Sequence, residues 1–107
     1  MTLPNEFTNY LETDGDMEFE TNYEFGGYII LEPLDLIEQF NTDIEISKHA
    51  PNYTAFTSDG GGEVFAFDKE GAIFLLPLIG MSPDDATKVA KSWNEYESNK
   101  MKMENKS

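Results

Sequence analysis

The sequence contains no cysteine and a single histidine, His49. Disulfides, thiolate metal sites and cysteine nucleophiles are therefore excluded. The serines have no second histidine to serve as a general base. Because His49 stands between Lys48 and the Ala50-Pro51 pair, we interpret it as a surface or structural residue in a loop. We expect no enzymatic activity and no cofactor.

Basic residues are scarce as well, with seven Lys and Arg against twenty-one Asp and Glu and a net charge of −14. Such a chain cannot neutralise a run of phosphates, which argues against nucleic-acid binding, and an anionic membrane surface would repel it. The longest apolar stretches, residues 28–31 and 72–79, are far too short to span a bilayer, and the N-terminus lacks the pattern of a secretion signal. We expect a cytoplasmic protein whose partner is basic.

Aromatic residues are plentiful, with eight Phe, five Tyr and one Trp. Leu, Ile, Val and Phe make up about 23% of the chain, above the roughly 20% below which a highly charged chain stays disordered. A length of 107 residues corresponds to one folded domain. Residues 1–87 carry eighteen acids and two lysines, whereas the end of the chain is slightly basic. We expect a domain over residues 1–97 and a polar tail, 98–107, that frays.

Apolar spacing and turn residues predict eight elements. They are a helix from Leu3 to Leu11 that Gly15 ends, two strands between Met17 and Leu31 with a turn at Gly26-Gly27, a helix from Pro33 to Asn41, strands at Tyr53–Thr57, Glu63–Asp68 and Ala72–Leu78, and a helix that Ser82 caps and whose apolar stripe reaches Tyr96. This order predicts a single α+β domain with a mainly antiparallel sheet and helices packed against it.

Four segments in order carry a family resemblance. They are Leu3-Pro4 with Phe7, Tyr10, Leu11 and Asp14-Gly15; Gly27 to Leu34 followed by Asn41; Ser58-Asp59-Gly60-Gly61-Gly62-Glu63 with Phe67-Asp68; and Leu76-Pro77-Leu78 with Ala90 to Tyr96. Over residues 3–96 they resemble the SUKH superfamily, which is named for yeast cell-wall-synthesis regulators and is abundant in bacteria. Family members usually carry another helix before the Leu-Pro pair, so we expect either a shortened version of the domain or a chain that was trimmed at this end. Trp93 stands where Phe is commoner, and both fill a core position.

The resemblance implies a protein-binding domain. Bacterial SUKH proteins are mostly immunity proteins, which bind the catalytic domain of a polymorphic, often contact-dependent toxin and block it in the cell that made it. Many of these toxins are nucleases, which must be basic to hold their substrate, so an acidic inhibitor gains steering and complementarity. Two alternatives are a non-enzymatic regulatory or scaffold module with several partners, as the yeast relatives suggest, and an acidic nucleic-acid mimic that binds DNA-processing proteins broadly.

Local charge density, and not a family motif, selects the candidate contact residues. The acids of this group are Asp14, Asp16, Glu18, Glu20 and Glu24, with Tyr23 or Tyr28 as an aromatic anchor. Residues 14–25 do not fit a calcium-binding loop, because its sixth position, a glycine in the motif, is Phe19, and its twelfth, a glutamate, is Phe25. Gly60-Gly61-Gly62 lacks the lysine of a phosphate loop and predicts a tight turn.

Overall fold

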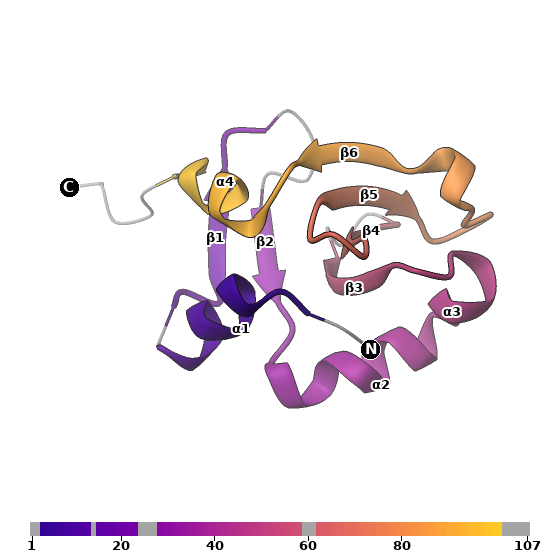
Figure 1. Ribbon diagram of the computed structural model, residues 1–107, viewed down its shortest axis with the longest axis horizontal. Coiled ribbons are helices and arrows are strands. Elements are labelled where there is room, and N and C mark those ends of the chain that lie inside the picture. The colour runs from indigo at the N-terminus through magenta and orange to yellow at the C-terminus, as the bar shows by residue number, and fades with distance from the viewer. Residues whose placement is uncertain (1–2, 14, 24–27, 59–61, 102–107) are drawn as a thin grey trace.

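The computed structural model describes residues 3–13, 15–23, 28–58 and 62–101, and of Met101 only the backbone (Figure 1). In the element names, η marks a short 3-10 helix. The order is α1 (Asn5–Glu12), β1 (Glu18–Thr21), β2 (Tyr28–Leu31), η1 (Leu34–Leu36), α2 (Ile37–Asp43), α3 (Ile46–His49), β3 (Thr54–Ser58), β4 (Glu63–Phe67), β5 (Ile73–Pro77), η2 (Pro83–Asp85), β6 (Thr87–Ala90), α4 (Trp93–Ser98) and β7 (Lys100–Met101). The expected turns at Gly26-Gly27 and Gly60-Gly61 lie outside the described residues.

The seven strands form one sheet in the order β6-β5-β4-β3-β2-β1-β7, and every pairing is antiparallel. Strands β2 and β3 share two residue pairs, whereas β4 and β5 share five. At this narrow junction the sheet curls, so that β1 and β2 run in a different direction from β5 and β6 (Figure 1). The predicted α+β class is confirmed. No helix in the described part of the chain is long and apolar enough to cross a membrane.

One face of the sheet packs against α1 and α4. Helix α1 contributes Phe7, whose ring centroid lies 4.9 Å from that of Trp93 at the start of α4. Each buried ring contributes roughly 2–3 kcal/mol through the apolar area that it removes from water. The fully buried aromatic residues of this core are Phe7, Phe19, Phe56, Phe65, Phe67, Trp93 and Tyr96. The aromatic residues that are plentiful in the sequence therefore hold both helices on the sheet.

The opposite face of the sheet is only partly covered. Ile46 of α3 and the adjacent Ala50 pack over Val64 of β4 and Leu76 of β5, both of which are fully buried. This cover ends before β2, where Ile30 remains 57% exposed on the same face. The half of this face formed by β1 and β2 is therefore open to solvent.

Asn41 was expected to end the second helix, but α2 continues to Asp43, so that prediction is wrong. The buried Asn41 side chain instead donates from Nδ2 to the backbone oxygen of Ala55, at 2.8 Å, and accepts from its N–H at 2.7 Å. Strand β2 pairs with β3 only at Thr57 and Ser58. The amide therefore satisfies backbone groups of β3 where no strand neighbour reaches them.

The loop expected around His49 is also wrong in part, because His49 is the last residue of the short helix α3. Glu45 precedes this helix in the left-handed conformation, with a φ of 57°. A helix of one turn offers too few positions for a periodic apolar pattern, so the sequence did not indicate it.

The single helix predicted from Ser82 to Tyr96 is wrong. Ser82 does accept from the N–H of Asp84, at 3.2 Å, but η2 ends at Asp85 and the chain then forms the edge strand β6. A second cap begins α4: Oγ of Ser92 accepts from the N–H of Glu95 at 3.1 Å. The Glu95 carboxylate in turn accepts from the N–H of Lys91, at 2.7 Å, one residue before the N–H that the carboxylate of a capping box binds.

Candidate functional site

The outer side of β1 and β2 forms a small exposed surface, which we call the open face. Its members are Glu18, Glu20, Tyr28 and Ile30. Strand side chains alternate between the two sides of a sheet, and the intervening residues of both strands point into the core. Glu18 pairs with Ile30 and Glu20 pairs with Tyr28. Two carboxylates therefore stand beside two exposed apolar side chains, of which Tyr28 is 45% and Ile30 57% exposed.

The two glutamates of the open face repel one another. They are two positions apart on one strand, a separation of roughly 7 Å, at which like charges in water repel by about 0.6 kcal/mol. Among the described residues, no lysine forms an ion pair with Glu18 or Glu20. A cationic group placed between them would remove this repulsion.

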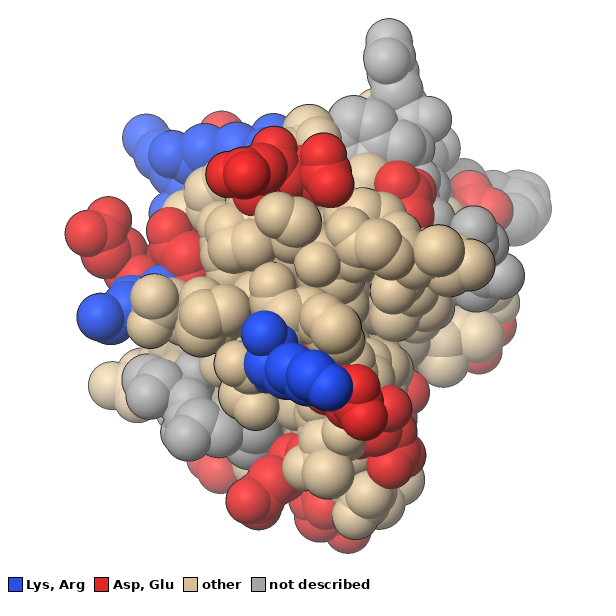
Figure 2. Space-filling model, turned by 90° about the vertical axis from the view of Figure 1, so that its right-hand side faces the viewer, with Lys and Arg blue, Asp and Glu red and all other residues tan. Residues whose placement is uncertain are grey.

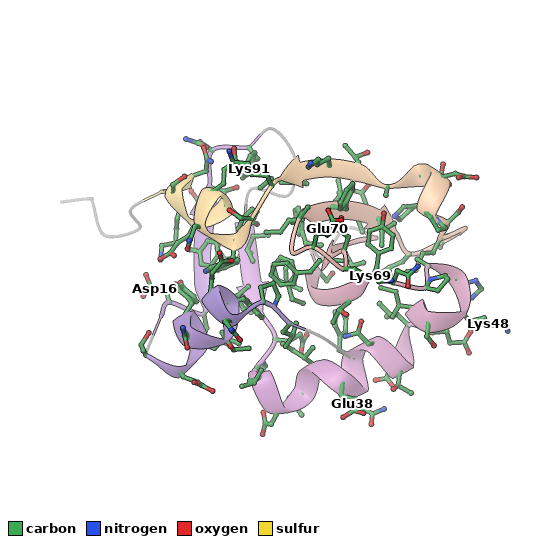
Figure 3. The ribbon with its side chains drawn as sticks, viewed as in Figure 1. Asp16, Glu38, Lys48, Lys69, Glu70 and Lys91 are labelled. Atoms are coloured by element: carbon green, nitrogen blue, oxygen red, sulfur yellow. The ribbon has the colours of Figure 1, made fainter. Side chains whose placement is uncertain are left out.

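Asp16, a third predicted contact residue, is already engaged. Its carboxylate lies 3.6 Å from Nζ of Lys100, and its backbone oxygen accepts from the Tyr10 hydroxyl at 2.6 Å. Lys100 also donates to the Tyr10 hydroxyl at 3.0 Å and lies over the rings of Tyr10 and Phe19. Burial alone would lower the pKa of Lys100, but these hydroxyl and carboxylate contacts outweigh it and raise the pKa. Asp16 (Figure 3) thus lies beside the cation that anchors β7 against α1.

Tyr23, predicted as a possible anchor, packs inward. Its ring stacks on Tyr96 with centroids 5.5 Å apart, and its hydroxyl accepts from Nδ2 of Asn99 at 3.1 Å. Burial, followed by the nearby Glu95 carboxylate, raises the pKa of the Tyr23 hydroxyl. Tyr28 is therefore the candidate aromatic residue that lies on the open face.

The structure brings Glu18, Glu20 and Tyr28 together on this face, whereas Asp14 and Glu24 lie outside the described residues. Ile30 is the member that sequence reasoning missed. In Tyr28-Ile29-Ile30-Leu31 no charged residue marks an outer side, because both sides of β2 are apolar. The only available signal was indirect, through pairing with a strand whose outer residues are glutamates.

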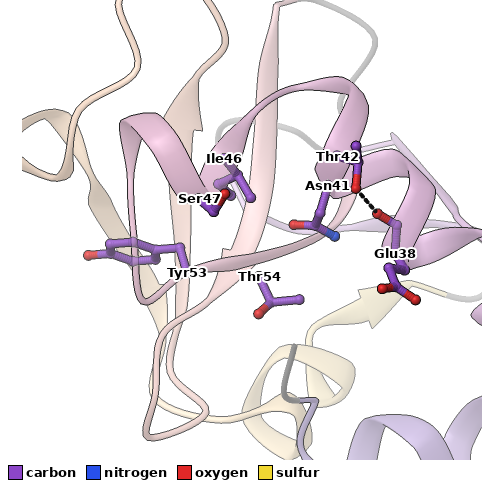
Figure 4. Close-up of a pocket in the computed structure, with 7 residues that line it drawn as sticks. All are labelled: Glu38, Asn41, Thr42, Ile46, Ser47, Tyr53 and Thr54. Atoms are coloured by element: carbon purple, nitrogen blue, oxygen red, sulfur yellow. Dashed lines mark hydrogen bonds between the residues drawn. The ribbon is translucent and has the colours of Figure 1, made fainter.

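A pocket of about 240 Å³ lies where α2, α3 and the start of β3 meet (Figure 4). Glu38, Thr42 and Tyr53 are among its lining residues, together with Asn41. The Asn41 amide is committed to Ala55, and the Thr42 hydroxyl donates to the backbone oxygen of Glu38 at 3.1 Å. We interpret this pocket as part of the joint between helices and sheet.

The described residues hold no cluster of side chains that could bind a metal ion. Nε2 of His49 lies 3.5 Å from a carboxylate oxygen of Glu45, one helical turn away, and the pair is exposed. No three His, Asp or Glu side chains of the described ranges lie close enough to hold a metal ion. Phe19, at the sixth position of the rejected calcium loop, is 1% exposed in β1. The chemistry available at the site is therefore that of a contact surface, with carboxylates and apolar side chains.

Comparison with known proteins identifies the domain. A search of curated proteins finds no match. A family model described as SMI1 / KNR4 family (SUKH-1) matches residues 1–99, which include every segment that carries the resemblance seen in the sequence. The match also includes both strands of the open face. The chain therefore belongs to the SMI1/KNR4 family (SUKH-1).

Proposed function

We propose that this protein is an immunity protein that binds the catalytic domain of a basic polymorphic toxin, a nuclease, and neutralises it in the cytoplasm. The observation that carries the proposal is the open face, where Glu18 and Glu20 stand beside Tyr28 and Ile30 on a part of the sheet that none of the described helices covers. A partner would bury the apolar side chains and place basic groups against the carboxylates.

Family and charge support the same function. SUKH domains are generally non-catalytic immunity or regulatory proteins. A nuclease holds its substrate with basic residues, so the net charge of −14 steers the two proteins together. Basic residues of the toxin that contact Glu18 and Glu20 are then unavailable to phosphate. Inhibition follows from occupation of the substrate site and requires no chemistry from this chain.

The test compares two double variants of equal net charge. Glu18→Lys/Glu20→Lys reverses the open face, whereas Glu12→Lys/Glu70→Lys makes the same change at exposed positions of α1 and of the β4–β5 turn. The neighbouring open reading frames are first read for a toxin gene, and binding to the catalytic domain of that toxin is followed by stopped flow at several salt concentrations. We expect the open-face variant to associate at least about tenfold more slowly and with a weaker salt dependence, and the control variant to lose less than about threefold.

Co-expression with the toxin domain supplies the functional readout. Wild-type protein should rescue growth, and the open-face variant should fail to do so while retaining the thermal unfolding midpoint of the control variant. Equal association rates for the two variants would remove the open face from the proposal. A wild-type chain that neither binds the toxin domain nor rescues growth would favour the second candidate, a regulatory or scaffold module, which the family's yeast members suggest.

A further inference from the structure

The turn after β5 presents an isoleucine to solvent. Ile79 is 92% exposed, the largest exposed fraction among the large apolar side chains of the described residues. The following residue, Gly80, has a φ of 73°, a conformation that glycine adopts without steric cost. Turn positions are usually filled by Gly, Pro, Asn, Asp and Ser, so the fold gains nothing from an isoleucine here.

The turn begins at Leu78, which strand pairing places on the same side of the sheet as the open face. Across the strands, Ile30 pairs with Ser58, Ser58 with Val64, and Val64 with Leu76. Leu78 is two residues beyond Leu76, so its side chain points to that same side. Its N–H donates to the oxygen of Gly62 at 2.8 Å, which continues the pairing of β4 and β5 to the turn.

Val64 and Leu76 are buried, but the apolar side chains at either end of this row are not. Leu78 is 37% exposed and is followed by Ile79. We call Tyr28, Ile30, Leu78 and Ile79 the apolar rim. Three strand spacings separate β2 from β5, about 14 Å, whereas a standard interface of about 800 Å² per partner is roughly 30 Å wide. One partner can therefore cover both ends of the rim.

Net charge selects the kind of partner. Figure 2 shows the side of the molecule that carries α3 and the turn between β5 and β6, where a broad tan surface is bordered by acidic side chains and also carries lysines. Two copies of a chain with a net charge of −14, each with Glu18 and Glu20 beside the rim, would repel one another. The partner that fits is a basic protein whose own apolar patch is flanked by Lys or Arg.

We infer that Leu78 and Ile79 form a second, apolar contact for the basic partner that the open face binds. The inference rests on the proposed function and assigns different kinetic roles to the two contacts. The carboxylates accelerate association, and the apolar turn slows dissociation, because burying an aliphatic side chain lengthens the lifetime of a complex without changing long-range attraction.

The test uses Ile79→Ser, with Leu36→Ser as the control. Leu36 is an exposed leucine of η1, 50% exposed, so both changes remove a solvent-facing aliphatic side chain. Binding to the toxin domain encoded beside the gene is measured by surface plasmon resonance. We expect Ile79→Ser to dissociate about tenfold faster, with an unchanged association rate and salt dependence, and Leu36→Ser to match wild type.

Three results would overturn the inference. If Ile79→Ser dissociates at the wild-type rate, the turn is not a contact, although the open face can still be one. If Leu36→Ser dissociates as fast as Ile79→Ser, the effect is non-specific apolar adhesion. Sedimentation that shows a homodimer dependent on Ile79 would assign the turn to a second copy of the chain. The proposed function itself fails only if the wild-type protein does not bind the toxin domain, so the two failures can be told apart.

Discussion

Tyr96 carries a buried hydroxyl that has no hydrogen-bond partner among the described residues. An unpaired buried hydroxyl costs about 1–3 kcal/mol of folding free energy. The ring itself packs well, stacked on Tyr23 and edge-on to Phe19. Tyr96→Phe keeps the ring and removes the hydroxyl, so we expect it to raise the free energy of unfolding by about 1 kcal/mol.

Tyr10→Phe is the matched control, because it removes the same atom from a tyrosine of the same core. The Tyr10 hydroxyl donates to the backbone oxygen of Asp16 at 2.6 Å and accepts from Nζ of Lys100 at 3.0 Å. Its loss should lower the free energy of unfolding by about 1–2 kcal/mol. One chemical change is thus expected to act with opposite signs at two positions.

Alkaline pH gives a second readout of the Tyr96 hydroxyl. Burial, with a smaller contribution from Tyr23, raises the pKa of Tyr96 well above the ordinary value near 10. Above pH 10 the unfolded chain releases this proton and the folded chain keeps it, so the folded state keeps its full stability below pH 10 and loses stability as the pH rises. At pH 11 the loss from Tyr96 is on the order of 1 kcal/mol. This part of the alkaline destabilisation should be absent from Tyr96→Phe.

Urea unfolding of the three proteins at pH 8 and pH 11 measures both effects. The reasoning is refuted if Tyr96→Phe is less stable than wild type at pH 8, because the hydroxyl would then have a partner. It is also refuted if wild type and Tyr96→Phe lose the same stability between the two pH values, since Tyr96 would then ionise in the folded state. The raised pKa of Lys100 acts in both proteins and does not affect this difference.

Two packing predictions can be checked by the same unfolding assay. Asn41→Ala and Asn41→Asp should each lower the free energy of unfolding by about 2–4 kcal/mol. The alanine removes both partners of the Ala55 backbone, and the aspartate places a carboxylate oxygen against the Ala55 carbonyl oxygen. An Asp variant as stable as wild type would contradict this role. Gly15→Ala should cost about 1–3 kcal/mol, because a Cβ there would lie 2.5 Å from the Tyr10 ring, and an unchanged unfolding midpoint would show that the ring moves away freely.

The structure shows that the acidic residues have different roles. Net charge alone treats every carboxylate as equivalent, but the Asp16 carboxylate lies beside Lys100, and Glu95 caps a helix. Among the described residues, Glu18 and Glu20 form no such ion pair or helix cap, and they stand beside exposed apolar side chains. A contact surface is therefore better identified by carboxylates that lack a structural partner than by the density of acids along the chain.

The sequence indicated elements correctly where a local signal was sufficient. Alternation predicted β1 and β2, and the Ser82 cap was placed correctly although its helix was too long. Residues 86–90 were predicted as helix because Ala86, Val89 and Ala90 also satisfy a helical period. In the structure this segment is a strand because it pairs with β5, and a local sequence pattern does not report that pairing.

Composition and periodicity by themselves determined the α+β class, the aromatic core and the acidic character, because each depends on counts or on neighbouring residues. Only tertiary structure decided which acids are exposed together. Pairing of β1 with β2 placed Glu18 and Glu20 beside Tyr28 and Ile30, and the limited reach of α2 and α3 left them uncovered. The position of Ile79 relative to this face likewise depends on the register of four strands, because a side chain's surroundings are set by pairing across the sheet.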